Sequence, residues 1–579
     1  MLEQPNLLIQ NLKIFNVHLK KFIPGHLAIR GERIFSIVPE SFDFSQDRLY
    51  PEQWNNEFCA PERLDGQGLW AIPGLIDIHL HVESSMVTPP FFAQALIRNG
   101  VTTAVADPHE IANVFGVAGI RAMIRASRGL DVDLFYQIPS CVPATDLETA
   151  GAAIGVRELR ELAALDEMIA LGEVMDFVDL IHNPDSKIRR LVSAARQRRL
   201  VVEGHCPNLI GPDLAAYMFY GSDSDHTFQT SETLQHRIAQ GMFLQIQEKS
   251  IYAETIRYLD GLQDFDYFAL VTDDVMADEL EKRGHLNVLI RAAIAQGLSP
   301  EKALYAATFA PAQRMQLHDR GALSAGKMAD VLIVKDVESF EIHQVYKKGR
   351  LVHPQAKPGV RERGTFPAQF YQSVHVEPLS TDQFRVPAPI KTGESTCRVM
   401  EVQTNTTYTR EIHTPISVAD GLLQWQNADV CLVAVFERHG RGNSVGYGFA
   451  TGACLTRGAA ATTYAHDSHN LLVIGHSPEE MALAANTVIQ SQGGIAVVEG
   501  RAVKARVALP VAGLMAEESV STVGQALSEV KQALVEQGYR HRNVIMSLAT
   551  LTLPVSPELK LSDRGLIHVP TRSFVDLVI

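Results

Sequence analysis

The chain has 579 residues, a length that allows about three or four domains rather than one large core. Its 52 Lys and Arg residues against 66 Asp and Glu residues give a net charge of −14. This balance argues against a general nucleic-acid binder, because phosphate contacts need clustered cations. With 46% hydrophobic and 20% charged residues, the composition is that of a globular protein and excludes disordered and collagen-like chains.

The first residues lack the basic and apolar regions of a signal peptide, and no apolar run approaches the ~20 residues that span a bilayer. The six cysteines are scattered without a Cys-x-x-Cys pair, which is typical of reduced thiols rather than of a disulfide framework. We therefore expect a cytoplasmic protein that contacts neither membranes nor nucleic acid.

Short alternating strands flank a long central segment on both sides. They occur within residues 1–68 and return within residues 322–375. We expect these two segments to form one small β-sandwich domain, which leaves residues 69–321 as an insertion. A length of ~250 residues is typical of a (β/α)8 barrel.

Within the insertion, buried strands alternate with helical patterns, as at 90–99 and 188–196. The expected strands are 72–81, 102–109, 133–140, 169–175, 199–206, 222–227, 242–248 and 267–274. Eight such units predict the α/β class and a closed (β/α)8 barrel of the TIM type. The reactive side chains of such a barrel lie at the carboxyl ends of its strands.

Residues 357–385 are rich in Pro, Gly and polar residues and are interpreted as a linker. Residues 386–579 mix strands with helices and predict a C-terminal α+β domain. One helix in it has a clear start, because Ser477, Pro478 and Glu480 form a capping box ahead of an apolar run.

Candidate metal ligands stand at the ends of the predicted barrel strands. His79 and His81 end the first strand, and side chains two residues apart on a strand project to the same side. The other candidates end strands 4, 5, 6 and 8: Glu173, His205, His226 and Asp273. Any one of them could be a buried polar residue, but together they offer ligands for two metal ions with one bridging carboxylate.

This ordered set resembles the amidohydrolase superfamily, metal-dependent hydrolases on a distorted (β/α)8 barrel beside a small β domain built from both chain ends. In that family strand 4 supplies a bridging Lys or Glu. Here strand 4 offers Glu173, while Lys187 lies well past the strand. The resemblance implies that His79, His81 and Asp273 hold one ion, that His205 and His226 hold the other, and that Glu173 is shared.

Local motifs narrow the resemblance to the bacterial adenine deaminases over nearly the whole chain. They occupy residues 73–86, 107–114, 139–144, 171–175, 203–207, 272–274 and 465–470. This family implies hydrolysis of adenine to hypoxanthine and ammonia by a hydroxide bridging two metal ions, in purine salvage. It favours Mn(II) or Fe(II), with Zn(II) as an alternative, and a homo-oligomer, either a homodimer or larger.

The reaction also needs proton transfer. Asp273 is expected to take a proton from the attacking water. For protonation of the purine N1 we expect Glu110 first and Glu83 second, although either could instead orient a ligating histidine. His109 and Asp274 are expected to contact the substrate.

Several roles stay open at this point. The cluster His466, Asp467 and His469 could bind metal, cover the barrel mouth or form a solvated loop, and it is kept out of the metal set. The roles of His182 and Asp185 are not assigned.

Three other interpretations deserve weighing. His81-Val82-Glu83 also fits the His-x-Glu of the zinc nucleobase deaminases, but the Pro-Cys-x-x-Cys that must follow is absent. The same metal site could open a cyclic amide or deaminate a related purine or nucleoside. A metal-free barrel serving as an assembly scaffold would have lost ligands, whereas every ligand position here is filled.

Overall fold

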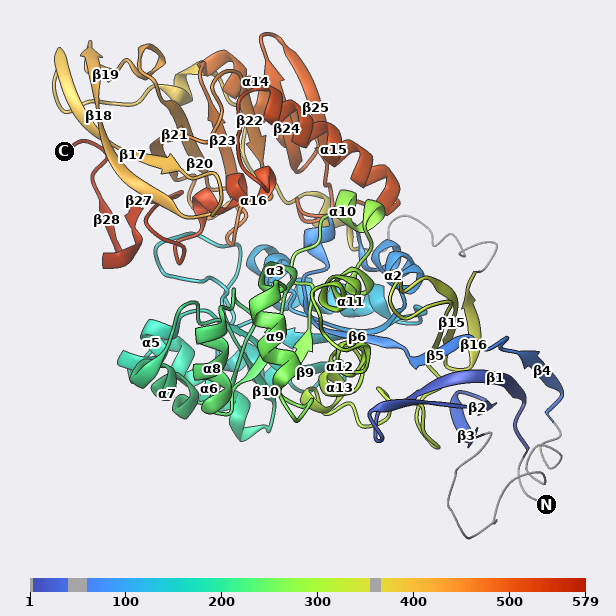
Figure 1. Cartoon of the computed structure of the whole chain (residues 1–579). Coiled ribbons are helices and arrows are strands. Elements are labelled where there is room, and N and C mark those ends of the chain that lie inside the picture. The colour runs from blue at the N-terminus through green and yellow to red at the C-terminus, as the bar shows by residue number, and fades with distance from the viewer. Residues whose placement is uncertain (1–3, 40–59, 355–365) are drawn as a thin grey trace.

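The computed structural model describes residues 4–39, 60–354 and 366–579. Strands from both flanks of the central segment pair in one sheet, in the order β16-β15-β14-β5-β1-β2-β3 with β4 beside β1 (Figure 1). Its strands are β1 (Leu7–Asn16), β2 (Lys21–Arg30), β3 (Arg33–Pro39), β4 (Glu62–Asp65), β5 (Trp70–Pro73), β14 (Val331–Val334), β15 (Ile342–Lys347) and β16 (Arg350–His353). β14 pairs antiparallel with β5, and β5 pairs parallel with β1, so β5 joins strands from the two flanks in this sheet. The predicted segments also include 1–3, 40–59 and 355–365, which lie outside the described residues.

Between the flanks lies the distorted barrel that the alternating pattern predicts. Its parallel strands are β6 (Leu75–Leu80), β7 (Val101–Ala106), β8 (Asp133–Ile138), β9 (Met168–Val174), β10 (Val201–Gly204), β11 (Ser224–Asp225), β12 (Phe243–Ile246) and β13 (Phe268–Leu270). They form one sheet from β6 to β10 and a second from β11 to β13. At one seam the Asp273 N–H donates to the His79 carbonyl at 3.0 Å. At the other the Gly204 N–H donates to Ser224 Oγ at 3.0 Å.

Most of the barrel strands are shorter than predicted, and two of the differences move residues into another element. The expected strand 72–81 is divided, because β5 ends at Pro73 within the small sheet and β6 begins at Leu75 in the barrel. The expected strand 102–109 ends at Ala106, because Pro108 has no N–H to extend a strand ladder. His109 and Glu110 therefore start helix α3 (His109–Ser127) instead of ending a strand.

Helices follow the strands and cover the outside of the barrel. They are α2 (Pro89–Arg98), α3, α4 (Val156–Leu162), α5 (Phe177–His182), α6 (Lys187–Gln197), α7 (Gly211–Tyr220), α8 (Ser231–Ala239), α9 (Ala253–Gly261), α10 (Ala277–Lys282), α11 (Leu286–Ala295), α12 (Pro300–Ala306) and α13 (Phe309–Arg314). Because helices pack outside and side chains fill the inside, β6 and β7 are buried at every position, the polar residues Asp77 and Thr103 included.

The C-terminal domain is built on one long mixed sheet, in the order β19-β18-β17-β21-β20-β23-β22-β24-β25. Its strands are β17 (Gly393–Val402), β18 (Thr409–Ala419), β19 (Leu422–Leu423), β20 (Cys431–Phe436), β21 (Val445–Gly452), β22 (Ala459–Thr462), β23 (Leu471–Gly475), β24 (Gly494–Glu499) and β25 (Ala502–Ala508). A small sheet of β26 (Leu559–Ser562), β27 (Gly565–His568) and β28 (Ser573–Val575) follows helices α14 (Pro478–Gln490), α15 (Val520–Glu536) and α16 (Val544–Ala549). The predicted cap of α14 is confirmed, since Ser477 Oγ accepts the Glu480 N–H at 3.3 Å.

This domain packs on the barrel through α15, which lies against α10 (Figure 1). Lys531 on α15 pairs with Asp278 on α10 at 2.8 Å. Next to this contact, the Thr88 N–H donates to the Ala516 carbonyl at 3.1 Å and the Ala516 N–H donates to the Met86 carbonyl at 2.9 Å. The C-terminal domain is therefore fixed beside the loop that follows β6.

None of the helices in the described part of the chain combines the length and the apolar character needed to cross a membrane.

A buried ion pair ties the small sheet to the barrel. Lys347 on β15 is 1% exposed. Its Nζ lies 2.6 Å from the carboxylate of Asp330 and 2.8 Å from that of Asp133, the first residue of β8. Lys347→Met should leave buried carboxylates without this partner and lower the free energy of unfolding by about 3–5 kcal/mol, measured by urea denaturation. As a control, Lys335→Met removes an ion pair with Glu341 whose side chains are half exposed, and should cost less than about 1 kcal/mol. Equal losses of unfolding free energy in the two variants would contradict a stabilising role of the buried Lys347 ion pair.

Gly172 on β9 leaves room for Asp107 at the end of β7. A Cβ at Gly172 would lie 2.0 Å from Asp107 Oδ2, an atom that accepts the Glu173 N–H at 3.2 Å. Gly172→Ala should therefore push Asp107 away and lower the stability by about 1–3 kcal/mol, measured as a shift in the urea midpoint. Gly261→Ala is the matched control, because its Cβ would meet no atom within 4 Å. A Gly172→Ala protein as stable as this control would show that the contact is not tight.

Candidate metal centre

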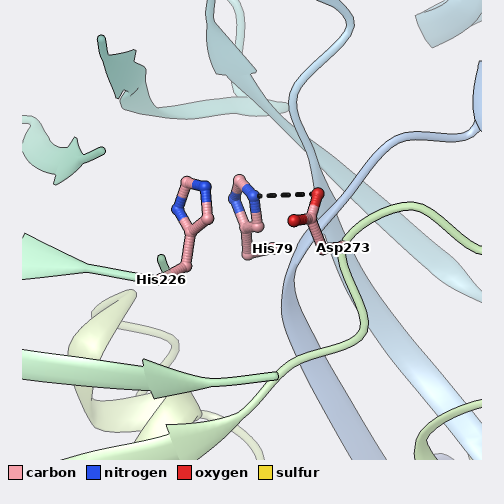
Figure 2. A group of neighbouring side chains, drawn as sticks. All are labelled: His79, His226 and Asp273. Carbon is pink, nitrogen blue, oxygen red and sulfur yellow. Dashed lines mark ion pairs between the residues drawn. The ribbon is translucent and has the colours of Figure 1, made fainter. Parts of the chain in front are cut away.

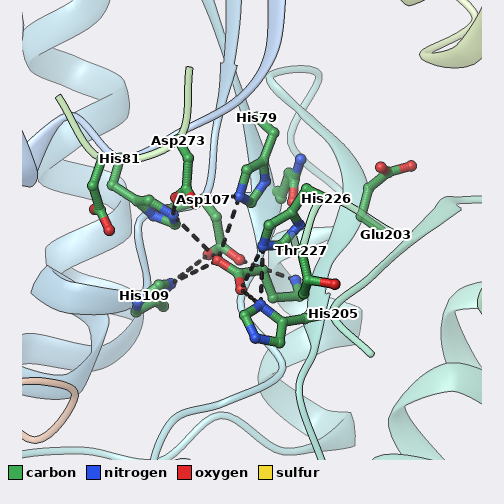
Figure 3. Close-up of polar contacts among 12 residues, drawn as sticks. His79, His81, Asp107, His109, Glu203, His205, His226, Thr227 and Asp273 are labelled. Atoms are coloured by element: carbon green, nitrogen blue, oxygen red, sulfur yellow. Dashed lines mark hydrogen bonds and ion pairs between the residues drawn. The ribbon is translucent and has the colours of Figure 1, made fainter. Parts of the chain in front are cut away.

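The six predicted ligands converge at the carboxyl ends of the barrel strands, and Figure 3 labels five of them, His79, His81, His205, His226 and Asp273. Glu173, the last-but-one residue of β9, lies at the centre of the group. Its Oε1 is 3.7 Å from His79 Nε2 and 3.2 Å from His81 Nε2. Its Oε2 is 2.9 Å from His205 Nδ1 and 3.3 Å from His226 Nε2. One carboxylate thus presents one oxygen to each of two histidine pairs, as a bridging ligand must.

Asp273 completes the pair formed by His79 and His81. Its Oδ1 lies 3.6 Å from His79 Nε2 and 3.3 Å from His81 Nε2, as Figure 2 shows for His79. Its backbone has φ of 62°, a left-handed conformation that Asp adopts more readily than most residues. This turn brings the carboxylate back toward the first strand, and Gln247 Nε2 donates to its other oxygen, Oδ2, at 2.5 Å.

The chemistry of these side chains fits two divalent ions. Both ring nitrogens of His79 and the Nδ1 of His226 are buried without a hydrogen-bond partner in the described part of the chain. Buried polar atoms rarely stay unpaired, and one of these, His79 Nε2, lies 3.7 Å from Glu173 Oε1 and 3.6 Å from Asp273 Oδ1. Groups of candidate ligand atoms lie within 4.8 Å of one another, among them His79, His81 and Glu173, and His79, His226 and Asp273.

The pKa values of the two carboxylates in the cluster are lowered by the imidazoles around them. Burial alone would raise the pKa of Glu173, but the imidazoles of His226, His205 and His81 outweigh burial and hold it well below its usual range. Asp273 behaves likewise: burial is opposed by His79 and His81, and its pKa is lowered. Both carboxylates therefore remain ionised, as metal ligands require.

Neighbouring groups fix the orientation of the ligands. The His81 Nδ1 lies 3.0 Å from the carbonyl oxygen of Asp107, so that its Nε2 is free to face the centre. Asp225, immediately before His226, is fully buried and paired with the buried Arg237. The Cys206 N–H donates to Asp225 Oδ1 at 2.7 Å, which ties the loop of His205 to the loop of His226.

A second layer of carboxyl groups lies beside the ligands. The Ser84 hydroxyl is 3.0 Å from Glu110 Oε1 and 2.5 Å from Asp274 Oδ1, and the Tyr464 hydroxyl donates to it at 3.0 Å. A hydroxyl has a single proton to donate, so Ser84 cannot fully satisfy two ionised carboxylates. Glu110 is fully buried and Asp274 is only partly buried. Burial raises the pKa of Glu110, which favours its protonated form.

Glu83, the second candidate acid, is also fully buried. Burial, and then the charge of Glu110, raise its pKa to about 8. Its Oε1 accepts the Ile111 N–H at 3.2 Å in the first turn of α3. Glu83 thus positions the start of α3, on which Glu110 stands.

The loop after β22 is not solvated, so the solvated-loop alternative for His466, Asp467 and His469 is wrong. These three side chains are at most 5% exposed, because the C-terminal domain lays the loop over the barrel. His466 Nδ1 comes within 3.9 Å of Glu110 Oε1. His109 is buried next to the centre, with its Nδ1 3.9 Å from Glu173 Oε1. His182 and Asp185 are exposed on and after α5.

Four residues of the site were not singled out from the sequence: Ser84, Asp107, Gln247 and Tyr464. Gln247 follows β12 as the ligands follow their strands, so the same strand-end signal could have found it. Asp107 stands in the motif that contains His109 and Glu110. Tyr464 had no such signal, because its place depends on how the C-terminal domain docks.

Comparisons with known proteins agree with this arrangement. The sequence model of the Amidohydrolase family matches residues 70–352, and that of the Adenine deaminase C-terminal domain matches residues 406–573. "Adenine deaminase 2" of Shouchella clausii is 47% identical over 99% of this chain and 98% of the relative. "Adenine deaminase" of Clostridium perfringens is 42% identical over 99% of this chain and 100% of the relative. "Adenine deaminase 2" of Oenococcus oeni is 38% identical over 99% of both chains.

The relatives cover 99% of the chain, and the two family models match the barrel segment and most of the C-terminal domain. The chain belongs to the adenine deaminase family, whose barrel is that of the amidohydrolases.

Proposed function

We propose that this protein hydrolyses adenine to hypoxanthine and ammonia. The observation that carries the proposal is the Glu173 carboxylate, which presents Oε1 to His79 and His81 and Oε2 to His205 and His226. This is the arrangement of a two-ion hydrolytic centre. The substrate follows from the full-length relatives, which are named adenine deaminases.

The residues would hold two divalent ions, one by His79, His81 and Asp273 and the other by His205 and His226, with Glu173 shared. Such ions, when bound, activate water as a nucleophile at neutral pH. Imidazole and carboxylate ligands suit Mn(II), Fe(II) and Zn(II), and we propose Mn(II) or Fe(II).

Asp273 serves as the base in this proposal. Its Oδ1 faces His79 and His81, while Gln247 donates to its Oδ2 and holds the carboxylate in place. An ionised carboxylate there can accept a proton from the attacking water and later deliver it to the departing nitrogen. Its low pKa ensures that it begins the reaction ionised.

Glu110 serves as the acid. Attack at C6 of adenine is easier when N1 is protonated, and this requires a protonated carboxyl group that is not bound to metal. Burial raises the pKa of Glu110, which supports this role, and its Oε2 has no hydrogen-bond partner in the described part of the chain. Asp274, across Ser84 from Glu110, is proposed to contact the substrate.

Adenine turnover tests the proposal directly. The chelated and Mn(II)-reloaded protein should convert adenine to hypoxanthine, followed by ultraviolet absorbance, and the chelated protein should be inactive. Glu173→Gln should lower kcat at least about 10³-fold, because an amide cannot bridge two cations as an anion does. Guanine, adenosine and a hydantoin are tested alongside. If the metal-replete protein turned over one of these but not adenine, the substrate assignment would be wrong.

The pH profile tests the acid. Activity needs the protonated form of Glu110, so it should persist below the raised pKa of this group and fall as the pH rises through it. Glu110→Gln should lower kcat by about 10²–10⁴-fold and remove this alkaline limb. Glu83→Gln, a second buried carboxyl group, should retain the limb. If Glu83→Gln lost the alkaline limb of the pH profile and Glu110→Gln kept it, Glu83 rather than Glu110 would be the acid.

A further inference from the structure

A buried arginine, Arg438, lies two residues past the end of β20 in the C-terminal domain. Its side chain is fully buried. Its guanidinium donates to the carbonyl oxygens of His469, of Ser373 at 2.8 Å and of Ala512 at 2.9 Å. The Ser373 hydroxyl accepts a further hydrogen bond at 3.0 Å. None of these acceptors carries a negative charge, so the guanidinium fixes the path of the chain rather than balancing a carboxylate.

The three carbonyls belong to segments that are far apart in the sequence. His469 stands in the loop between β22 and β23, Ser373 in the segment that enters the C-terminal domain, and Ala512 between β25 and α15. A planar guanidinium donates in several fixed directions at once, which the compact ammonium of a lysine cannot do. Burial lowers the pKa of Arg438 to about 9, which shows what the fold expends to keep a cation here. Arg438 is thus a clamp on three segments.

Further hydrogen bonds anchor both ends of the loop of residues 463–470 to this clamp. At one end the Arg438 N–H donates to Asn470 Oδ1 at 3.1 Å. At the other end Thr463 Oγ1 donates to the carbonyl oxygen of Gly513, the residue after Ala512, at 2.7 Å. A Cβ at Gly513 would lie 2.8 Å from Arg438 Nη1, so the guanidinium packs directly on this backbone.

The clamped loop carries the two side chains that reach from the C-terminal domain into the barrel mouth. Tyr464 donates its hydroxyl to Ser84 at 3.0 Å, and His466 Nδ1 lies 3.9 Å from Glu110 Oε1. Both contacts lie on the side of the site that holds Glu110, the proposed acid. A displacement of the loop would therefore open this side to water.

We propose that Arg438 is a positioning residue of the deamination, which holds loop 463–470 so that Tyr464 and His466 close the site beside Glu110. This inference rests on the proposed function, because it gives the closed loop a role in the step that Glu110 performs. Arg438 acts through the backbone of the loop. An arginine with a purely structural role would stabilise the domain, and its replacement would leave the kcat of the folded protein unchanged.

Steady-state kinetics of the Mn(II)-loaded full-length protein test the role. Arg438→Lys should lower kcat at least about tenfold and change KM less than about threefold, because the acid acts after adenine has bound. The matched control is Arg320→Lys, at a buried arginine that pairs with Asp133. It should lower the thermal midpoint and keep kcat. A folded Arg438→Lys protein with the kcat of the wild type would overturn the proposal.

Hydrogen–deuterium exchange gives a readout that does not depend on turnover. In the wild type the amides of His466 and His469 donate to the carbonyl oxygens of Ala549 at 3.1 Å and Ala465 at 2.8 Å. In Arg438→Lys, peptides that cover residues 463–470 should exchange at least about tenfold faster, while peptides from β9 should exchange as in the wild type. Unchanged exchange of the loop would contradict the clamp.

A second variant displaces the guanidinium without removing it and serves even if Arg438→Lys fails to fold. Gly513→Ala should lower kcat and speed exchange of the loop, because its Cβ would meet Arg438 Nη1. Gly421→Ala is its control: the φ angles are similar, 73° at Gly513 and 76° at Gly421, but a Cβ at Gly421 would meet no atom within 4 Å. Equal kcat and equal exchange in the two variants would count against the proposal.

The two readouts separate this proposal from the proposed function. Faster exchange of loop 463–470 in Arg438→Lys, in a protein that does not deaminate adenine, would support the clamp and contradict the proposed function. An Arg438→Lys protein that deaminates adenine at the wild-type rate, with unchanged exchange, would overturn the clamp and support the proposed function.

Discussion

The site depends on a carboxylate that could not remain buried by itself. Glu173 is 3% exposed, and the cost of removing its charge from water must be offset by cations nearby. Four imidazoles surround it, two on each oxygen, and both ring nitrogens of one of them, His79, have no hydrogen-bond partner in the described part of the chain. Two divalent ions would offset the buried charge of Glu173 and would also give the unpartnered ring nitrogens of His79 a ligand-binding role.

Burial of this kind requires a cover, and the barrel alone does not provide it. The C-terminal domain contributes Tyr464, whose hydroxyl donates to Ser84, and His466, which lies next to Glu110. These contacts exclude water from the acid side of the site, where the raised pKa of Glu110 depends on desolvation. In the proposed mechanism the C-terminal domain therefore contributes to the chemistry, because its packing helps to bury Glu110 and so to raise the pKa of that group.

The convergence of the six candidate ligands could be predicted from the sequence because strand geometry is local. Two histidines separated by one residue share a face of any strand, and Glu173 and Asp273 follow apolar runs typical of buried strands, whereas His226 follows the short polar strand Ser224–Asp225. The position of Glu110 was less well predicted: Pro108 ends the ladder, and Glu110 lies in the first turn of α3. Tyr464 and the burial of His466 could not be predicted, since they depend on the docking of a domain more than 300 residues away in sequence.

The proposed acid and base differ in their surroundings rather than in their residue chemistry. Against the effect of burial, His79 and His81 lower the pKa of Asp273, whereas burial raises the pKa of Glu110. Environments that push the pKa values of two carboxyl groups in opposite directions are how a fold assigns an acid and a base at one pH. In the proposed mechanism this difference makes Asp273 the base and Glu110 the acid, with the Ser84 hydroxyl between Glu110 and Asp274.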